Sequence, residues 1–275
     1  MSERTVLITN CGKQSISYLE NGAGVPLVLL HGVGSNARSW EGQLDGLSDR
    51  FRVIAWDAPG YGRSMPVEPA APTASDYSAR LKQFADTLGL AQFHLIGHSL
   101  GAIMAARFAV EFRARVISLT LASPSSGHAR LPQEEQRRLR DARLNDLREM
   151  GPRAMAESRG PRLVSSQASD AVRARVIDNM SKVRPEGYTQ AVWLLTSSDT
   201  AADVARLPGD LPVQFIIGGQ DRVTPPQSTR AVAAARPAAT LHELPECGHA
   251  LYLEQPGAFN ELVTRFARGD LNAAA

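Results

Sequence analysis

The chain has 275 residues, of which 43% are hydrophobic and 21% are charged, and its formal net charge is +2. This composition is ordinary for a globular protein, and a charge so close to neutral argues against binding to nucleic acid or to an anionic membrane. The two cysteines are too few for a disulfide framework, and no apolar run approaches the ~18 residues that span a bilayer. The first ten residues lack a signal-peptide pattern, so we expect a cytoplasmic protein.

Strand and helix patterns alternate along most of the chain. Alternating polar and apolar residues at 5–9 and 16–19 predict a hairpin at a sheet edge. Continuous apolar runs predict buried strands at 26–30, 51–56, 93–96, 116–122 and 213–219, with a shorter strand at 240–244. Apolar residues at helical spacing predict helices at 40–47, 75–88, 102–109, 230–236 and 259–266. The alternation indicates an α/β fold with a mostly parallel eight-stranded sheet and helices on both faces.

Residues 127–200 interrupt this alternation. Arg-rich amphipathic stretches replace the strands there, at 133–150, 152–158, 168–183 and 186–195. We expect most of their arginines on solvated helix faces, paired with Glu and Asp. Helices inserted between two strands of a sheet predict a lid. The chain then divides into a first core part (1–126), the lid (127–200) and a second core part (201–275).

Ser99 lies in Gly97-His98-Ser99-Leu100-Gly101, between a predicted strand and a predicted helix. A serine on so sharp a turn has strained backbone angles and points outwards, and a Cβ at either glycine would collide with a neighbouring element. The helix that follows directs its free N–H groups at any anion that forms beside Ser99. This pattern also occurs by chance in loops. The assignment of Ser99 as a nucleophile therefore requires a base and an acid elsewhere in the chain.

His249 is the candidate base and Asp221 the candidate acid. Each follows a predicted strand near the end of the chain, and the carboxyl ends of parallel strands are where open α/β sheets place their chemistry. The alternatives are that His249 is a polar surface residue and that Asp221 caps a helix. Asp57 is a rival acid, but it precedes Ser99 in a Pro/Gly-rich turn, where aspartate ordinarily binds local backbone N–H groups.

Taken together, these motifs resemble the α/β-hydrolase fold family over nearly the whole chain. The order serine, acid, histidine is that of the family. The matching motifs are His31-Gly32, Asp57 to Ser64, the turn at Ser99, Gly219-Gln220-Asp221 and Gly248-His249. Families of this fold with an aspartate nucleophile, such as epoxide hydrolases and haloalkane dehalogenases, are disfavoured by the serine at position 99.

The resemblance implies a role for each site residue. Ser99 Oγ attacks a carbonyl carbon, His249 takes its proton and returns it to the leaving group, and Asp221 holds the imidazole in the required tautomer. The backbone N–H groups of Val33 and Leu100 form the oxyanion hole. No cofactor is implied, and the sequence contains no metal-ligand motif such as Cys-x-x-Cys.

The substrate is a small molecule by the same resemblance. Residues 27–64 are similar to 3-oxoadipate enol-lactonases and related hydrolases of small lactones and esters. The meta-cleavage-product C–C hydrolases are the alternative, but they typically carry tryptophan directly after the histidine, where this chain has Ala250. A carboxylate-bearing substrate would be held by one or two arginines of the lid. Trp193 and Leu194 are candidates for an acyl pocket, although such residues are more often lid core.

Other classes of function stay open from the sequence. Acyltransferases of this fold keep the same three residues and exclude water. Non-catalytic receptors of this fold often lose one of the three, whereas this chain has all of them. Assembly into a homodimer also stays open.

Overall fold

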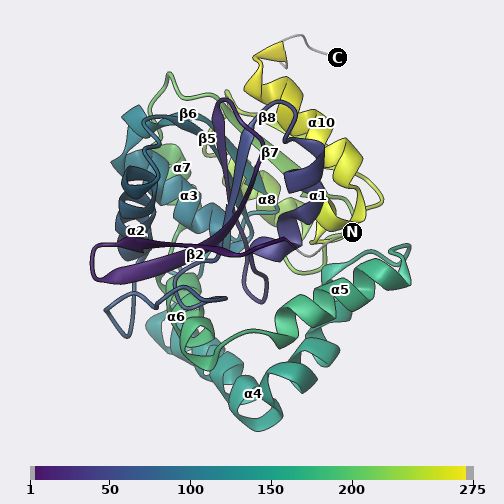
Figure 1. The fold of residues 1–275 in the computed structure, drawn as a ribbon. Helices are drawn as coiled ribbons and strands as arrows, with labels where there is room; N and C mark the ends of the chain where they lie inside the picture. The colour runs from purple at the N-terminus through teal and green to yellow at the C-terminus, as the bar shows by residue number, and fades with distance from the viewer. Residues whose placement is uncertain (1–3, 271–275) are drawn as a thin grey trace.

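The computed structural model describes residues 4–270, whose core is one eight-stranded sheet (Figure 1). The strand order is β1-β2-β4-β3-β5-β6-β7-β8. Only β1–β2 and β2–β4 pair antiparallel, so the mostly parallel sheet is confirmed. The strands are β1 (Leu7–Cys11), β2 (Gln14–Asn21), β3 (Pro26–Leu30), β4 (Arg52–Trp56), β5 (Phe93–His98), β6 (Val116–Ala122), β7 (Val213–Gly218) and β8 (Thr240–Leu244).

Helices cover both faces of the sheet because the central strands are apolar on both sides. In β3, Val28 and Leu30 belong to one core cluster, whereas Leu27 and Leu29 belong to a second cluster on the opposite face. The first cluster includes residues of α2 (Ala74–Thr87), α3 (Leu100–Glu111) and α8 (Pro226–Ala233). The second includes residues of η1 (Ala37–Trp40), α1 (Glu41–Gly46), α9 (Leu251–Glu254) and α10 (Pro256–Ala267). The predicted arrangement of helices on both faces is therefore confirmed.

Two elements near the C-terminal half differ from the sequence prediction. Helix α8 begins at Pro226, four residues before the predicted start, because a proline suits the first turn of a helix. The helix α7 (Thr200–Ala205) was not predicted, since six residues are too few to show a helical period. Its N-terminus is capped by the Asp199 side chain, which accepts a hydrogen bond from the Ala202 N–H.

Between β6 and β7 the chain forms a helical insertion, within residues 127–200, at one end of the sheet (Figure 1). Its elements are α4 (Gln133–Arg159), η3 (Gly160–Leu163), α5 (Asp170–Ser181) and α6 (Pro185–Ser197). Helix α4 is broken at Gly151, whose φ of 72° and ψ of 169° are not helical. The break separates the two helices that the sequence predicted on either side of this position.

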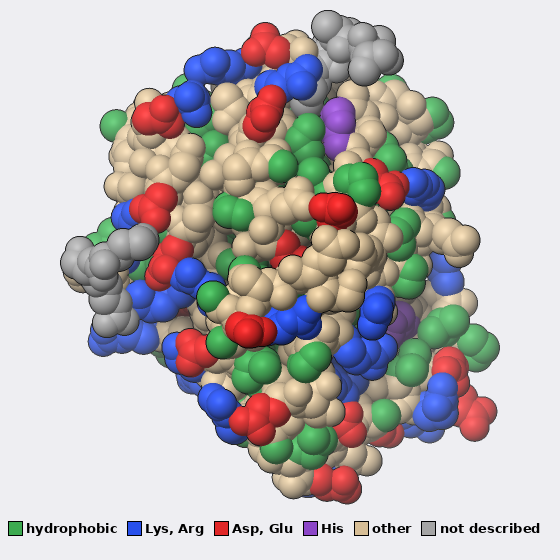
Figure 2. Space-filling model, turned by 90° about the vertical axis from the view of Figure 1, so that its right-hand side faces the viewer, with side chains coloured by type: hydrophobic (Ala, Val, Ile, Leu, Met, Phe, Trp, Pro, Cys, Tyr) green, Lys and Arg blue, Asp and Glu red, His purple; other side chains and the backbone are tan. Residues whose placement is uncertain are grey.

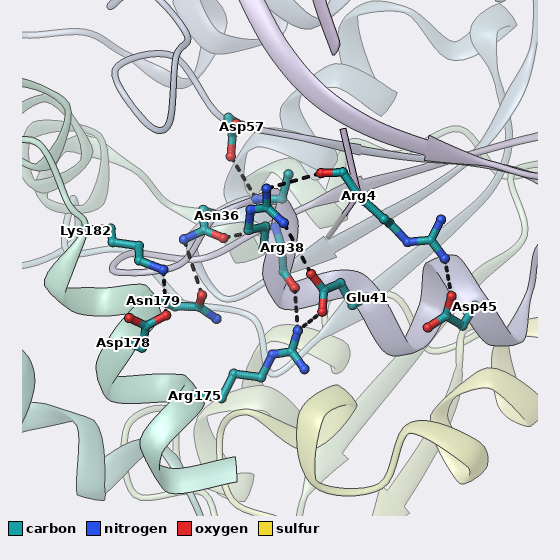
Figure 3. Close-up of polar contacts among 11 residues, drawn as sticks. Arg4, Asn36, Arg38, Glu41, Asp45, Asp57, Arg175, Asp178, Asn179 and Lys182 are labelled. Atoms are coloured by element: carbon teal, nitrogen blue, oxygen red, sulfur yellow. Dashed lines mark hydrogen bonds and ion pairs between the residues drawn. The ribbon is translucent and has the colours of Figure 1, made fainter. Parts of the chain in front are cut away.

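Helix α5 joins the insertion to the segment after β3 (Figure 3). Arg175 forms an ion pair with Glu41 and also donates to the Arg38 carbonyl at 3.4 Å. The side chain of Asn36, which caps η1, donates to Asn179 at 3.5 Å. These contacts place α5 directly against the loop that follows β3.

Both cysteines are buried, and neither forms a disulfide. Desolvation raises the pKa of Cys247 to about 12, and burial also raises the pKa of Cys11. Within residues 4–270, no helix combines the length and the apolar character needed to cross a membrane.

Candidate active site

Ser99 occupies the turn between β5 and α3 with a φ of 54° and a ψ of −114°. A left-handed φ at a non-glycine residue is strained, as the sequence motif predicted. A Cβ at Gly97 would lie 2.4 Å from the Gly101 carbonyl oxygen, and one at Gly101 would lie 2.2 Å from the Leu30 carbonyl oxygen. Both glycines are therefore required by the close approach of β3, β5 and α3.

The acid and the base lie in the loops after β7 and β8, and their side chains meet. The Nδ1 atom of His249 is 2.8 Å from Oδ2 of Asp221, and both residues are buried. Because a carboxylate only accepts, Nδ1 carries the hydrogen and Nε2 keeps a free lone pair. A histidine in this tautomer can accept a proton at Nε2, as a general base must.

The surroundings of Asp221 keep it ionised. Its Oδ1 accepts from the backbone N–H groups of Val223 and Thr224 at 2.8 and 2.9 Å, and its Oδ2 accepts from the Thr224 hydroxyl at 2.8 Å. Burial opposes the charge, but the neighbouring His249 and these hydrogen bonds lower the pKa of Asp221 to about 2. Sequence reasoning missed Thr224, whose hydroxyl is also 3.2 Å from His249 Nδ1.

Ser99 and His249 line the same cavity, of about 520 Å³, between the end of the sheet and the helical insertion. Within residues 4–270, no hydrogen bond joins the Ser99 hydroxyl to the imidazole. Such bonds are often long in a ligand-free enzyme and tighten when substrate binds. The candidate acid and the candidate base are thus in hydrogen-bond contact, and the candidate nucleophile lines the same cavity as the candidate base.

The two candidate oxyanion donors also line this cavity. Leu100 is the first residue of α3, where the backbone N–H has no intrahelical acceptor. The Gly32 carbonyl accepts from His31 Nδ1 at 2.9 Å and from the Ser35 N–H at 3.3 Å. In a trans peptide the next N–H points the opposite way, so these bonds orient the N–H of Val33. This N–H has no acceptor in the part of the chain that the structure describes.

His98 supports the backbone of His249, a role that the sequence did not indicate. Its Nε2 donates to the His249 carbonyl at 2.8 Å, and the two ring centroids are 4.7 Å apart. Burial, aided by the neighbouring His249, lowers the pKa of His98 to about 3. His98 is therefore neutral and acts as a fixed hydrogen-bond donor.

Asp57, the rival acid, has a structural role. Its Oδ1 accepts from the Ala37 N–H at 2.8 Å, and its Oδ2 accepts from the Ser17 hydroxyl at 2.6 Å (Figure 3 shows the first contact). It thereby joins the loop after β4 to η1 and β2. The sequence context predicted bonds to backbone N–H groups of the same turn, whereas these two partners lie in distant parts of the chain.

The helical insertion supplies a charged wall of the cavity, with Arg143, Asp146, Arg159 and Arg162 among its lining residues. Arg159 is already engaged, since it forms an ion pair with Asp146 and donates to the Tyr188 hydroxyl at 2.9 Å. Arg143 and Arg162 have no hydrogen-bonding or ion-pair partner among residues 4–270. Their guanidinium groups are thus available to an anionic ligand.

Several other arginines of the insertion form the predicted pairs with acidic residues on exposed helix faces, whereas Arg137 and Arg148 have no such partner among residues 4–270. Arg138 pairs with Glu135 at 2.5 Å and Arg153 with Glu157 at 2.7 Å, one turn apart on α4. The face in Figure 2 shows basic and acidic side chains interspersed.

Trp193 and Leu194 are not among the residues that line the cavity, so of the two alternatives from the sequence, acyl pocket and lid core, Leu194 fits the second. Leu194 is fully buried in the main core cluster, and the Trp193 ring stacks under the Arg140 guanidinium at 3.8 Å. The next residue of α6, Leu195, lines the cavity instead. Consecutive helical residues point about 100° apart, so the apolar run alone did not show which of them faces the ligand.

Among residues 4–270, no group of three or more His, Cys, Asp or Glu side chains is arranged to hold a metal ion.

Residues 27–262 match the alpha/beta hydrolase family. The chain therefore belongs to this family, which the sequence motifs had indicated. The family and the names of its relatives support an enzyme that hydrolyses bonds.

Similar proteins include enzymes with different named activities. The dihydrolipoyllysine-residue acetyltransferase component of the acetoin cleaving system of Pseudomonas putida is 30% identical, over 94% of this chain and 68% of that protein. A 2-hydroxy-6-oxononadienedioate/2-hydroxy-6-oxononatrienedioate hydrolase from a Pseudomonas species is 28% identical, over 87% of each chain.

Solved structures share the whole architecture. A thermophilic esterase from Thermogutta terrifontis, with malate bound, has a TM-score of 0.85 and 25% identity, and the match covers 98% of this chain and 99% of that one. The enol-lactonase from Burkholderia xenovorans has a TM-score of 0.84 and 22% identity, over 95% and 100% of the two chains.

Proposed function

We propose that this protein is a serine hydrolase that cleaves a small ester or lactone by way of an acyl-enzyme. The observation that carries the proposal is the buried His249–Asp221 pair, at 2.8 Å, which opens onto the same cavity as Ser99. The hydrogen bond between them fixes the tautomer that a general base needs, and the strained turn presents the Ser99 hydroxyl to the cavity.

The reaction proceeds in two halves. Ser99 Oγ attacks the carbonyl carbon while His249 Nε2 takes its proton, and the N–H groups of Val33 and Leu100 stabilise the oxyanion. His249 then protonates the leaving alcohol, or the ring oxygen of a lactone. In the second half, water attacks the acyl-enzyme with His249 again as base, which releases the acid and restores Ser99.

The substrate carries an anionic group in this proposal. Arg143 and Arg162 line the cavity without an acidic partner among residues 4–270. A guanidinium group binds a carboxylate through paired hydrogen bonds. Similar proteins support this choice, since one is named for the hydrolysis of dioates and another holds malate.

The helical insertion acts as a lid over the two core parts, 1–126 and 201–275. Residues 1–3 and 271–275 of these parts lie outside the described residues. It supplies more than half of the cavity wall, from His128 to Leu195. Such a cover excludes water from the developing charges and strengthens their interaction with the oxyanion donors.

The release of p-nitrophenol from short-chain p-nitrophenyl esters tests the proposal. We expect turnover by the wild-type protein and none above background by Ser99→Ala, because the variant has no nucleophile. A wild-type rate no higher than that of the variant would instead favour a non-catalytic role.

C–C bond hydrolysis is the second candidate, favoured by the likeness to the dioate hydrolases. In this structure position 250 does not face the cavity, since Ala250 packs in a small cluster with Val164 and Val176. The tryptophan of the C–C hydrolases thus has no counterpart here. Turnover of a vinylogous diketone faster than of any ester or lactone would select this alternative.

Acyl transfer is a further candidate because of the likeness to the acetyltransferase components. It is tested by adding alcohol or thiol acceptors to the ester assay. A transfer product that exceeds the free acid in water would identify a transferase.

A further inference from the structure

Glu254 joins the loop of His249 to the helical insertion. It is the last residue of α9, five residues after His249. Its Oε1 accepts from the Gly248 N–H at 2.8 Å, and its Oε2 accepts from the Ser165 N–H at 3.0 Å. Gly248 directly precedes His249, and Ser165 lies in the insertion between η3 and α5. One carboxylate therefore holds two backbone segments that are distant in sequence.

The two segments are also in direct contact. A Cβ at Gly248 would lie 2.5 Å from the Val164 carbonyl carbon and 2.6 Å from the Ser165 nitrogen. On the other side of His249, the Ala250 N–H donates to the Leu163 carbonyl at 2.7 Å. The backbone is thus bonded to Glu254 or the insertion both immediately before and immediately after the histidine.

Glu254 has no cationic partner among residues 4–270. Both of its oxygens are used on backbone N–H groups, and hydrogen bonds to an ionised acceptor are about twice as strong as neutral ones. The insertion segment that it holds also reaches the cavity, because Arg162 and Leu163 line it. The position of His249 therefore depends on the position of the insertion segment that forms part of the cavity wall.

We propose that Glu254 is a positioning residue for the reaction. It holds His249 at the distance and angle needed to take the proton of Ser99, because it binds both the backbone next to His249 and the insertion segment 163–165 that packs against it. The proposal rests on the proposed function, in which His249 is the base. It assigns to Glu254 no contact with substrate.

The test compares Glu254→Gln with Glu261→Gln. The first replacement puts an NH2 group opposite one of the two N–H donors, so that one bond is lost. Glu261 is exposed on α10 and has no hydrogen bond or ion pair within the described residues, so its replacement makes the same charge change elsewhere. Gly248→Ala serves as a second variant, since its Cβ would push the insertion segment away while Glu254 is kept.

Rates are measured per active site, titrated with a fluorophosphonate that labels Ser99. For Glu254→Gln we expect kcat on p-nitrophenyl acetate to fall about tenfold with KM nearly unchanged, because a modest misplacement of a catalytic group has effects of this order or larger. The rate of fluorophosphonate labelling should fall by a similar factor, since it needs the same base. Gly248→Ala should behave alike, and Glu261→Gln should match the wild type.

A purely structural role would lower the number of titrated sites but leave kcat per site unchanged, and this result would overturn the proposal. Hydrogen exchange gives a readout that needs no substrate: segments 163–166 and 246–250 should both exchange faster in Glu254→Gln. If exchange is unchanged, the link itself is refuted. If the wild type is neither active nor labelled, the proposed function fails, while the exchange result still reports on the link.

Discussion

Within the proposed triad of Ser99, His249 and Asp221, several hydrogen bonds fix the orientation of the acid. The Asp221 carboxylate accepts hydrogen bonds from two backbone N–H groups and the Thr224 hydroxyl besides His249. Its orientation is therefore set by the loop after β7 and not by the histidine alone. A conservative replacement of Asp221 can therefore change its contact with His249 while the loop still holds the side chain in place.

We expect Asp221→Asn to fold normally and to lower kcat about 10⁴-fold, because an asparagine NH2 group facing His249 favours the wrong tautomer. Steady-state ester hydrolysis measures the effect, with Asp210→Asn as the control because Asp210 lies on the surface in an ion pair with Arg113. A loss below tenfold would show that Asp221 does not orient the base.

The cavity arginines lead to a second prediction for single residues. Arg143→Ala should raise KM for a carboxylate-bearing ester about ten- to hundredfold, since a hydrogen bond to a charged group contributes about 1.5–3 kcal/mol. KM for an uncharged ester should change little. Arg153→Ala is the control, because Arg153 lies on α4 beyond the break at Gly151, in an exposed pair with Glu157. Equal effects on both esters would contradict a carboxylate site.

Among the elements, α4 has a break whose backbone conformation favours glycine. Gly151 adopts φ 72° and ψ 169°, which a side chain resists, although a Cβ there would meet nothing within 4 Å. Gly151→Ala should therefore lower the free energy of unfolding by about 1–3 kcal/mol through backbone strain alone.

Gly209→Ala is the control for this effect, because a Cβ at Gly209 also meets open space and its φ is not in the left-handed region. Urea denaturation of both variants gives the comparison. Equal stability of the two would show that the left-handed backbone at position 151 imposes no measurable strain on alanine.

At the scale of the whole molecule, buried histidines contribute to the response to acid, and burial also lowers the pKa of His31. Burial lowers the pKa of His98 to about 3 and that of His94 to about 4. An unfolded chain exposes both to water, where histidine titrates near ~6.5. Between these values the unfolded state binds protons that the folded state does not, so acidification favours unfolding.

We therefore expect the free energy of unfolding to fall as the pH decreases from 6.5 to 4. The slope should reach up to about 1.4 kcal/mol per pH unit for each histidine. Urea denaturation at a series of pH values measures the slope, and His94→Asn should make it smaller by removing one titrating group. A variant with an unchanged slope would show that His94 does not contribute.

The sequence by itself determined the sheet, its covering helices and the three residues of the candidate triad. Buried strands such as 26–30 are recognisable because a continuous apolar run needs apolar neighbours on both faces, and Ser99 is recognisable because its glycines satisfy a local steric need. Asp221 and His249 follow from chain order, since parallel strands bring their carboxyl ends to one edge.

Only the tertiary structure decided which insertion residues face the cavity. It replaced Trp193 and Leu194 by Leu195, left Arg143 and Arg162 without acidic partners, and brought Glu254 to Gly248 and Ser165. Local patterns record periodicity and turn chemistry. They do not record the rotation of a helix or the meeting of distant backbone segments, because these depend on how all the elements pack together.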